Sequence, residues 1–301
     1  MSFSECCVRI DSHGRELIDD GTGSFPVAYY RDDFRAMNVP WHWHPEWEAV
    51  CIIEGSCTVA VGQEKRLLRA GEGFFVNSGV LHGCWDLEES GCIFHSLVFH
   101  PRLISGSPDS AIHLNYVLPL TENKALPWLP LSPSLSWQQE ALKAIEQAWT
   151  ACFEGSPGYE FTVRSCLSNL TCLLWAHMPQ AITPAEKRSG LGNLRIKSML
   201  SFIHNNFGEE LTVASIAAAA SVSESECLRC FRSSIGITPI QYLKQYRLQQ
   251  AAGLLVSTDQ KIIDISHRCG FQDISYFTRS FRQQMHCTPG QYRKNAERRS
   301  E

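Results

Sequence analysis

The sequence of 301 residues has no apolar run that approaches the roughly 20 residues needed to cross a membrane as a helix. Its most apolar stretches, such as 170–176, are short and interrupted by polar residues. The opening residues include Glu5 and Asp11 and lack the apolar core of a secretory signal. We therefore expect a soluble, cytoplasmic protein with no membrane partner.

The 13 cysteines lack the spacing of a disulfide or zinc framework. They are odd in number and spread from Cys6 to Cys287. Cys227 and Cys230 form a C-x2-C pair, but no second pair lies at the distance that a zinc site requires. We expect reduced thiols and no structural zinc at this pair.

Charge is divided unevenly along a chain of otherwise ordinary composition. The sequence is 44% hydrophobic and 19% charged, typical of a globular protein, and its length favours two domains. Residues 1–190 hold 13 basic and 22 acidic side chains, a net −9, whereas residues 191–301 hold 14 and 9, a net +5. A polyanion partner is therefore expected only at the C-terminal third.

The first two thirds of the chain predict a sheet followed by helices. Residues 25–100 contain short apolar segments broken at regular intervals by Gly, Asn and Ser, which predicts an antiparallel β-sandwich or barrel. Residues 101–134 hold six of the fourteen prolines and predict an irregular connection. Apolar residues at spacings of three and four then predict helices over 137–152 and 163–174. These helices either pack on the sheet or form the seam of a homodimer.

The C-terminal third contains an internal repeat. An offset of 50 residues aligns eight identical pairs: Ser225/Ser275, Arg229/Arg279, Phe231/Phe281, Arg232/Arg282, Thr238/Thr288, Pro239/Pro289, Gln241/Gln291 and Tyr242/Tyr292. Further upstream the offset becomes 49, so one residue is inserted. The segment is a duplicated unit.

Each repeat predicts two short helices joined by a tight turn. Thr212 and Asp273 can cap helices, and Ser223 with Glu226 forms a capping-box pattern. Gly270 suits a left-handed turn. Between the repeats, Thr238-Pro239 begins a long helix to about residue 256. Both repeats are therefore predicted to be helix-turn-helix units.

The second helix of each unit presents arginine opposite its apolar stripe. Ser225, Arg229 and Arg232 share the outer face of one helix. Their counterparts, with Thr278 nearby, share the outer face of the other: Ser275, Arg279 and Arg282. A guanidinium on such a helix can grip a guanine edge in the major groove, so we expect these residues to bind duplex DNA.

Residues 195–295 resemble the DNA-binding domain of the AraC/XylS family of bacterial transcription regulators, most closely over IIDISHRCGFQDISYFTRSFRQQMHCTPGQYRK. The resemblance implies that Arg229 and Arg279, with Ser225, Ser275 and Thr278, read bases. Arg232 and Arg282 suit phosphates. The first unit departs from the family by having Ser221 where a turn glycine is frequent and Leu228 where a polar residue is common.

The predicted sheet carries a cluster of histidines. His42, His44 and Glu48 are evenly spaced, so in one extended strand their side chains would share a face, and His82 follows a later strand. Residues 36–86 resemble the two cupin motifs, whose matching residues bind metal. The sequence departs from those motifs at three positions: Ala36, Asn77 and Asp86.

Three roles for the cluster stay open. In the first, His42, His44, Glu48 and His82 hydrogen-bond a small-molecule effector with no cofactor; in the second, they hold a divalent metal; in the third, they are structural. Trp41, Trp43, Trp47 and Trp85 are expected to form a stacking wall for a sugar or sugar derivative, with Trp43 as the residue assigned to the effector site.

The sequence thus predicts a multidomain α+β protein. It comprises a cupin-like effector-binding domain (1–130), a helical dimerisation region (131–179), a linker (180–194) and an all-α AraC-type DNA-binding domain (195–301). We expect a homodimeric, effector-controlled transcription regulator that is not an enzyme, binds promoter DNA and, if it is an activator, RNA polymerase. The alternatives are a metal-dependent cupin enzyme fused to a DNA-binding domain and a DNA-binding structural protein that needs no ligand.

Overall fold

The computed structural model describes residues 24–33, 39–86, 91–178 and 189–300, with side chains described from 195 to 294 in the last range. The chain separates into two compact units, one of which ends at Ser189 while the other continues from Gly190. None of the described helices combines the length and the hydropathy needed to cross a membrane.

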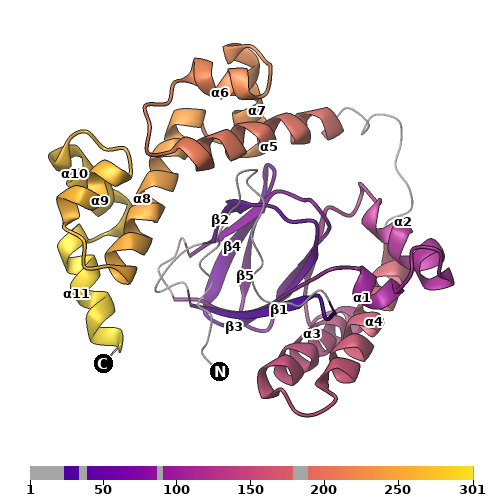
Figure 1. Cartoon of the computed structure of the whole chain (residues 1–301). Helices are drawn as coiled ribbons and strands as arrows, with labels where there is room; N and C mark the ends of the chain where they lie inside the picture. Colours follow the sequence, from indigo (N-terminus) through magenta and orange to yellow (C-terminus); the bar gives the residue numbers. More distant parts are fainter. Residues whose placement is uncertain (1–23, 34–38, 87–90, 179–188, 301) are drawn as a thin grey trace. The chain divides into compact units, whose positions relative to one another are not determined.

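The first unit contains two antiparallel sheets, as predicted (Figure 1). The five-stranded sheet has the order β1-β8-β3-β6-β9 and the four-stranded sheet the order β2-β7-β4-β5. The strands are β1 (Val27–Asp33), β2 (Val39–His42), β3 (Trp47–Glu54), β4 (Ser56–Val61), β5 (Glu64–Arg69), β6 (Gly73–Val76), β7 (His82–Trp85), β8 (Ile93–Phe99) and β9 (Trp128–Leu131).

Strand β3 shows how alternation builds the two apolar layers of this unit. Trp47, Ala49 and Cys51 face the core shared with the helices, because alternate side chains of a strand point to opposite faces. Val50 and Ile52 face the other way, into the core between the two sheets. Glu48 shares their parity, so its carboxylate points into the space between the sheets.

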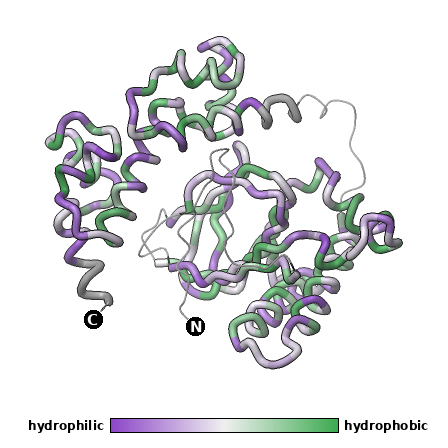
Figure 2. Tube along the Cα trace, viewed as in Figure 1, coloured by the Kyte–Doolittle hydropathy of each residue, from purple (hydrophilic) through white to green (hydrophobic). Residues whose placement is uncertain are grey.

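Helix α3 (Ser136–Glu154) covers the five-stranded sheet, and helix α4 (Tyr159–His177) packs on α3. Both helices match the predicted segments, and their apolar stripes join the core of the sheet (Figure 2 shows hydrophilic and hydrophobic residues alternating along them). The indole Nε1 of Trp149 on α3 donates a hydrogen bond to the carbonyl oxygen of Tyr30 on β1, at 2.8 Å. Packing on the sheet, the first of the two predicted roles, is therefore observed for α3.

The irregular connection predicted for 101–134 is wrong. It contains α1 (Arg102–Ser105), the π-helix η1 (His113–Val117), α2 (Leu118–Thr121) and strand β9. Its prolines occupy positions that tolerate them: Pro119 lies in the first turn of α2, and Pro130 lies in β9, at the edge of its sheet. Neither position requires a backbone N–H from proline.

The second unit is helical throughout its described secondary structure. Its helices are α5 (Ser189–Asn206), α6 (Val213–Ala219), α7 (Glu224–Ser234), α8 (Pro239–Ser257), α9 (Ile262–Arg268), α10 (Ile274–Met285) and α11 (Pro289–Ser300). The duplicated pairs are α6 with α7 and α9 with α10. The predicted linker 180–194 overlaps the start of α5, and its residues 180–188 lie outside the described part of the chain.

Most predicted helix ends are confirmed. Thr212, Thr238 and Asp273 are N-caps whose side chains accept backbone hydrogen bonds, and Gly270 has a φ of +76°. The capping box predicted for Ser223 and Glu226 is only half formed. The Ser223 hydroxyl accepts from the backbone N–H of Glu226 at 3.2 Å, but the Glu226 carboxylate pairs with arginines instead.

Candidate DNA-reading surface and effector pocket

Helices α7 and α10 expose the side chains predicted to read DNA. On α7 the buried stripe consists of Cys227, Cys230 and Phe231, which leaves Ser225, Arg229 and Arg232 exposed. On α10 the buried residues are Phe277, Ser280 and Phe281; Ser275, Arg279 and Arg282 are exposed, and Thr278 is half-buried. Helices α7 and α10 thus expose arginines at equivalent positions, as the repeat predicted.

The two turns reach the same backbone shape with different residues. Gly270 and Ser221 both have positive φ, +76° and +53°. A side chain at Gly270 would place a Cβ 2.7 Å from the Arg247 guanidinium and 2.7 Å from the carbonyl oxygen of Phe207. Ser221 therefore occupies, at some cost in strain, the turn position where glycine is favoured.

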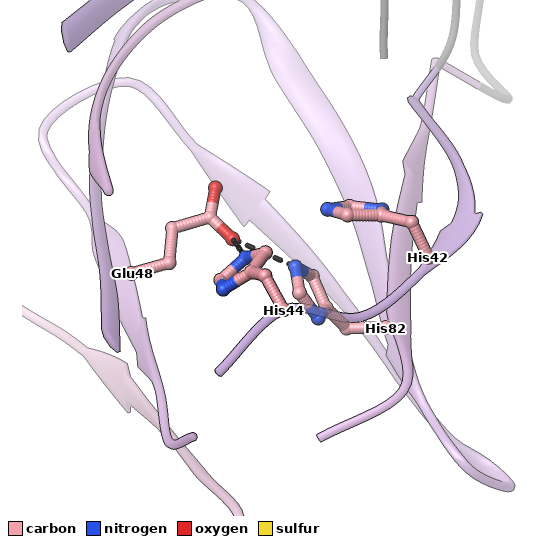
Figure 3. Close-up of side chains that lie close together, drawn as sticks. All are labelled: His42, His44, Glu48 and His82. Carbon is pink, nitrogen blue, oxygen red and sulfur yellow. Dashed lines mark hydrogen bonds and ion pairs between the residues drawn. The ribbon is translucent and has the colours of Figure 1, made fainter. Parts of the chain in front are cut away.

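The histidine cluster converges, but not from one strand as predicted. His42 ends β2 and pairs with His82 on β7 in the four-stranded sheet, whereas Glu48 lies on β3 in the other sheet. His44 lies in the connection between β2 and β3, where Pro45 interrupts the extended strand. The four side chains point toward one another across the space between the sheets (Figure 3).

Backbone carbonyls fix the orientation of all three imidazoles. The Nδ1 atoms of His42, His44 and His82 lie 2.9, 3.1 and 2.9 Å from the carbonyl oxygens of residues 40, 46 and 80. A carbonyl oxygen can only accept, so each Nδ1 carries the proton. In the neutral ring the Nε2 atom is then an electron-pair donor. Backbone contacts of this kind orient histidines that bind metals.

The Nε2 atoms meet a carboxylate. His82 Nε2 lies 2.7 Å and His44 Nε2 lies 3.5 Å from Oε2 of Glu48, and all four residues are buried. Burial would raise the pKa of Glu48, but the imidazoles of His82 and His44 outweigh burial and hold that pKa well below its usual range. Burial, with neighbouring His82 and His44, also holds the pKa of His42 well below its usual range.

A divalent transition-metal ion suits this donor set. All four candidate ligand atoms lie within 4.8 Å of one another. Metal–ligand bonds of about 2.1 Å put neighbouring ligands of a tetrahedral ion about 3.4 Å apart, so the distances from Glu48 to His82 and His44 lie on either side of that value. Three imidazoles and one carboxylate are typical ligands of zinc, iron, manganese or nickel.

A narrow pocket adjoins the cluster. It is lined by side chains from both sheets: Tyr30, Asp32, Val39, His42, Glu48, His82, Cys84, Phe94, Ser96 and Val98. The residues from β1 and β8 were not predicted. Asp32 is buried, and Ser96 donates a hydrogen bond to it at 3.5 Å. The sequence offered one signal for Asp32 and Ser96: each lies two residues from another pocket residue on its own strand, Tyr30 on β1 and Val98 on β8. Any buried strand face shows this spacing, so it does not identify a pocket.

The structure does not bring the four predicted tryptophans together as a wall of this pocket. Trp47 is fully buried in the core beneath the helices, because its odd position on β3 faces away from the pocket. Trp41 packs on Trp85, with ring centroids 5.4 Å apart. None of the four tryptophans belongs to the pocket lining, and neither does His44. His44 therefore contributes to the cluster and not to the pocket wall.

Two of the three departures from the cupin motifs have structural roles. The Asn77 amide nitrogen donates to the carbonyl oxygens of Leu120 and Leu126, at 2.8 and 3.1 Å, which ties β6 to the segment before β9. The Asp86 carboxylate accepts from the backbone N–H of Gly91 at 2.8 Å. Ala36 lies outside the described residues.

Comparison with known proteins identifies both halves of the chain. Residues 24–150 match the model of the AraC-like ligand binding domain, and residues 216–295 match that of a helix-turn-helix domain. The chain is 30% identical over 290 residues to the uncharacterized HTH-type transcriptional regulator YdeC of Bacillus subtilis, covering 95% of this chain and 97% of that protein.

Two further similarities extend over most of the chain. The HTH-type transcriptional activator RhaS of Pectobacterium carotovorum is 25% identical over 279 residues, covering 87% of this chain and 90% of its own. The crystal structure of ToxT from Vibrio cholerae aligns over 89% of this chain and 97% of its own, with 11% identity and a TM-score of 0.48. With a ligand-binding domain, a helix-turn-helix domain and a regulator related along nearly its whole length, the chain belongs to the AraC/XylS family and is an effector-controlled, DNA-binding transcription regulator.

Proposed function

We propose that this regulator reads promoter DNA with α7 and α10 and is controlled by a small molecule bound between its two sheets. The observation that carries the proposal is the duplication itself, which places an exposed arginine at the same position of two helices, Arg229 and Arg279. Ser225, Ser275 and Thr278 lie beside these arginines and complete the base-reading set. Arg232 and Arg282, one turn further along, contact phosphates.

Helix α8 supports simultaneous reading by both units. Its 19 residues, at about 1.5 Å each, span about 28 Å. Successive major grooves on one side of a duplex are about 34 Å apart. A helix of this length between the two helix-turn-helix units can therefore hold α7 and α10 near successive grooves.

Binding to a DNA site selected from a random library tests the base-reading role. Replacing Arg279 with Ala is expected to weaken binding to the selected site by about 1–3 kcal/mol and to relax selectivity at one base pair, because a bidentate guanine contact is lost. Arg282→Ala is expected to weaken binding to all duplexes alike. The control is Arg268→Ala, an exposed arginine on α9. Unchanged selectivity of the Arg279 variant would refute the role.

The pocket is suited to a hydroxyl-rich effector. Asp32, Glu48 and Ser96 place acceptor oxygens on its wall beside two imidazoles. A sugar or sugar derivative can donate hydroxyl hydrogens to these acceptors and stack its apolar face on Phe94. Because the pocket is narrow, the effector must widen it, and this widening is the conformational change that an effector can couple to DNA binding.

A divalent metal is the second candidate ligand of this domain. It is supported by the three Nδ1–H groups that donate to carbonyls and leave each Nε2 with a lone pair, and by the four candidate ligand atoms that lie within 4.8 Å of one another. His42, His44, Glu48 and His82 would hold the ion. When bound, a metal supplies a Lewis-acidic centre at the pocket wall that can bind an oxygen of the effector. Because the relatives found are transcription regulators, we assign this site to sensing rather than to turnover.

The protein is expected to act as a homodimer. Helix α4 and the neighbouring η1 keep large apolar side chains exposed; Phe161 is 81% exposed, and Tyr116 packs edge-on against Trp175. Exposed aromatic side chains of this kind are typical of protein interfaces. RNA polymerase is a further partner if the regulator activates transcription. Sedimentation of the intact chain measures the oligomeric state, and Phe161→Glu is expected to shift it toward the monomer.

A further inference from the structure

The base-reading arginine of the first helix-turn-helix unit, Arg229, is held by a neighbouring carboxylate. On α7, Nε of Arg229 donates to Oε2 of Glu226 at 2.8 Å, and Nη2 donates to Oε1 at 2.6 Å. The pair is bidentate, with two parallel bonds that fix the plane of the guanidinium. Because these bonds use Nε and one N–H of Nη2, Glu226 leaves the second N–H of Nη2 and both N–H groups of Nη1 unused, on a side chain that is 70% exposed.

The carboxylate is anchored from a second helix. Nη1 of Arg195, on α5, donates to the same Oε1 of Glu226 at 3.0 Å. The hydrogen bonds from Arg229, with the charges of Arg229 and Arg195, lower the pKa of Glu226 to about 2. Glu226 therefore remains ionised at neutral pH. Because Arg195 also holds the carboxylate, Glu226 can keep its position when Arg229 engages a base.

The second helix-turn-helix unit has no carboxylate at the position equivalent to Glu226. The 50-residue offset places Tyr276 at the position of Glu226 and Arg279 at that of Arg229. The nearest acidic side chain on the sequence, Asp273, is used to cap α10 through the backbone N–H groups of Ser275 and Tyr276. The two helix-turn-helix units therefore differ in how their reading arginine is held: two nitrogens of Arg229 donate to Glu226, whereas Arg279 interacts with the Asp273 carboxylate through charge.

We propose that Glu226 is a specificity-determining residue that positions Arg229 for one base pair. The carboxylate fixes the plane of the guanidinium, so that Nη1 and Nη2 can donate together to the two acceptors of a guanine, O6 and N7, in the major groove. It also offsets the charge of Arg229 and repels phosphate, so Arg229 itself gains little from non-specific backbone contact. In the second helix-turn-helix unit, where Tyr276 stands at the position of Glu226, Arg279 contributes more to the non-specific attraction.

This inference rests on the base-reading role proposed for Arg229, and the full-length chain allows the two to be tested separately. The probes are a selected DNA site, its single-base-pair variants in the first half-site, and random duplex. The proteins are wild type, Arg229→Ala, Glu226→Gln and the double variant. Glu224→Gln is the matched control, because Glu224 is exposed on the same turn and its replacement removes the same charge without touching the Arg229 guanidinium.

Glu226→Gln is expected to bind random duplex more tightly, with the slope of log affinity against log salt steeper by about 1. Discrimination at the base pair read by Arg229 should fall about 5- to 10-fold, since the guanidinium is no longer held in one plane. Glu224→Gln should raise affinity without losing discrimination. In the Arg229→Ala background, Glu226→Gln should cause no further loss of discrimination.

Two results would overturn the inference. If Glu226→Gln and Glu224→Gln have the same effect, or if Glu226→Gln leaves discrimination unchanged while Arg229→Ala abolishes it, Glu226 acts only through its charge and the positioning role is wrong. If Arg229→Ala itself leaves discrimination unchanged, the base-reading proposal fails, and the role of Glu226 fails with it. The thermal midpoint of each variant is measured beside that of the wild type, and equal midpoints establish that all the proteins compared are folded.

Discussion

Single residues decide the chemistry between the two sheets. Three imidazoles are oriented by backbone carbonyls, and the Nε2 atoms of His82 and His44 lie 2.7 and 3.5 Å from Glu48. Two electron-pair donors do not approach so closely without a positive charge between them. A proton on the His82 ring satisfies this contact, and a metal ion satisfies the contacts of all four residues at once.

Metal binding by the intact protein separates these alternatives. We expect one Co²⁺ or Zn²⁺ per chain by equilibrium dialysis, with a rise in thermal midpoint because an ion joins ligands of two sheets. His82→Gln should lose both the ion and the rise, whereas His177→Gln, an exposed histidine at the end of α4, should keep them. A wild-type protein that binds no ion, or a His82 variant that binds as well as wild type, would leave protonation as the answer.

Residue 221 offers a second test at this scale. Its φ of +53° is costly for serine and natural for glycine, although glycine also makes the unfolded chain more flexible. We expect Ser221→Gly to raise the free energy of unfolding by about 0.5 kcal/mol in urea denaturation. Ser233→Gly, within helix α7, should instead lower it by about 0.5 kcal/mol. A loss of stability in the first variant would contradict the strain assigned to this turn.

The sequence predicted residues that belong to a pattern and missed those that do not. His42, His44, Glu48 and His82 were identified from their spacing, although the turn at Pro45 places them on two sheets and a connection rather than one strand. Asp32 and Ser96 were missed because a polar residue within a buried strand has no motif, and its neighbours are set by pairing between distant segments. The diversion of Glu226 from Ser223 to arginine depends on Arg195, which lies 31 residues away.

At the scale of elements, local signals were sufficient for the helices of the second unit. Caps, a left-handed glycine and apolar stripes all lie within a few residues of the helix that they define, so α6 to α10 could be placed from the sequence. Strand β9 could not be placed, because it is defined by antiparallel pairing with β6 more than 50 residues earlier, between Phe74 and Pro130 for example. The proline-rich composition of residues 101–134 predicted an irregular connection instead.

Helix α8 depends on a reciprocal cap. The backbone N–H of Gln241 donates to the Thr238 hydroxyl at 3.3 Å, and the backbone N–H of Thr238 donates to the Gln241 side chain at 2.9 Å. Thr238→Ala is expected to lower the free energy of unfolding by about 1 kcal/mol, because one helix donor loses its partner. Thr238→Ser, which keeps the hydroxyl, should recover most of the loss. Equal stability of the two variants in denaturant titrations would show that the cap contributes little.

At the scale of the whole molecule, control requires the effector to bind one DNA-binding arrangement better than another. A molecule with equal affinity for both arrangements shifts nothing, however tightly it binds. The coupling is also reciprocal: if the effector changes affinity for DNA by some factor, bound DNA changes affinity for the effector by the same factor. This requirement distinguishes a regulatory pocket from a pocket that only stabilises the first unit.

The reciprocal coupling can be measured once a thermal-shift screen with sugars has given an effector. We expect the effector to change the affinity of the intact chain for its selected DNA site by about 5- to 150-fold, and that DNA to change the affinity for the effector equally. Asp32→Asn is expected to weaken effector binding, because the buried carboxylate can no longer accept two hydroxyl hydrogens, and to leave DNA binding without effector unchanged. An effector that binds wild type tightly but leaves affinity for DNA unaltered would show that the pocket does not control the reading helices.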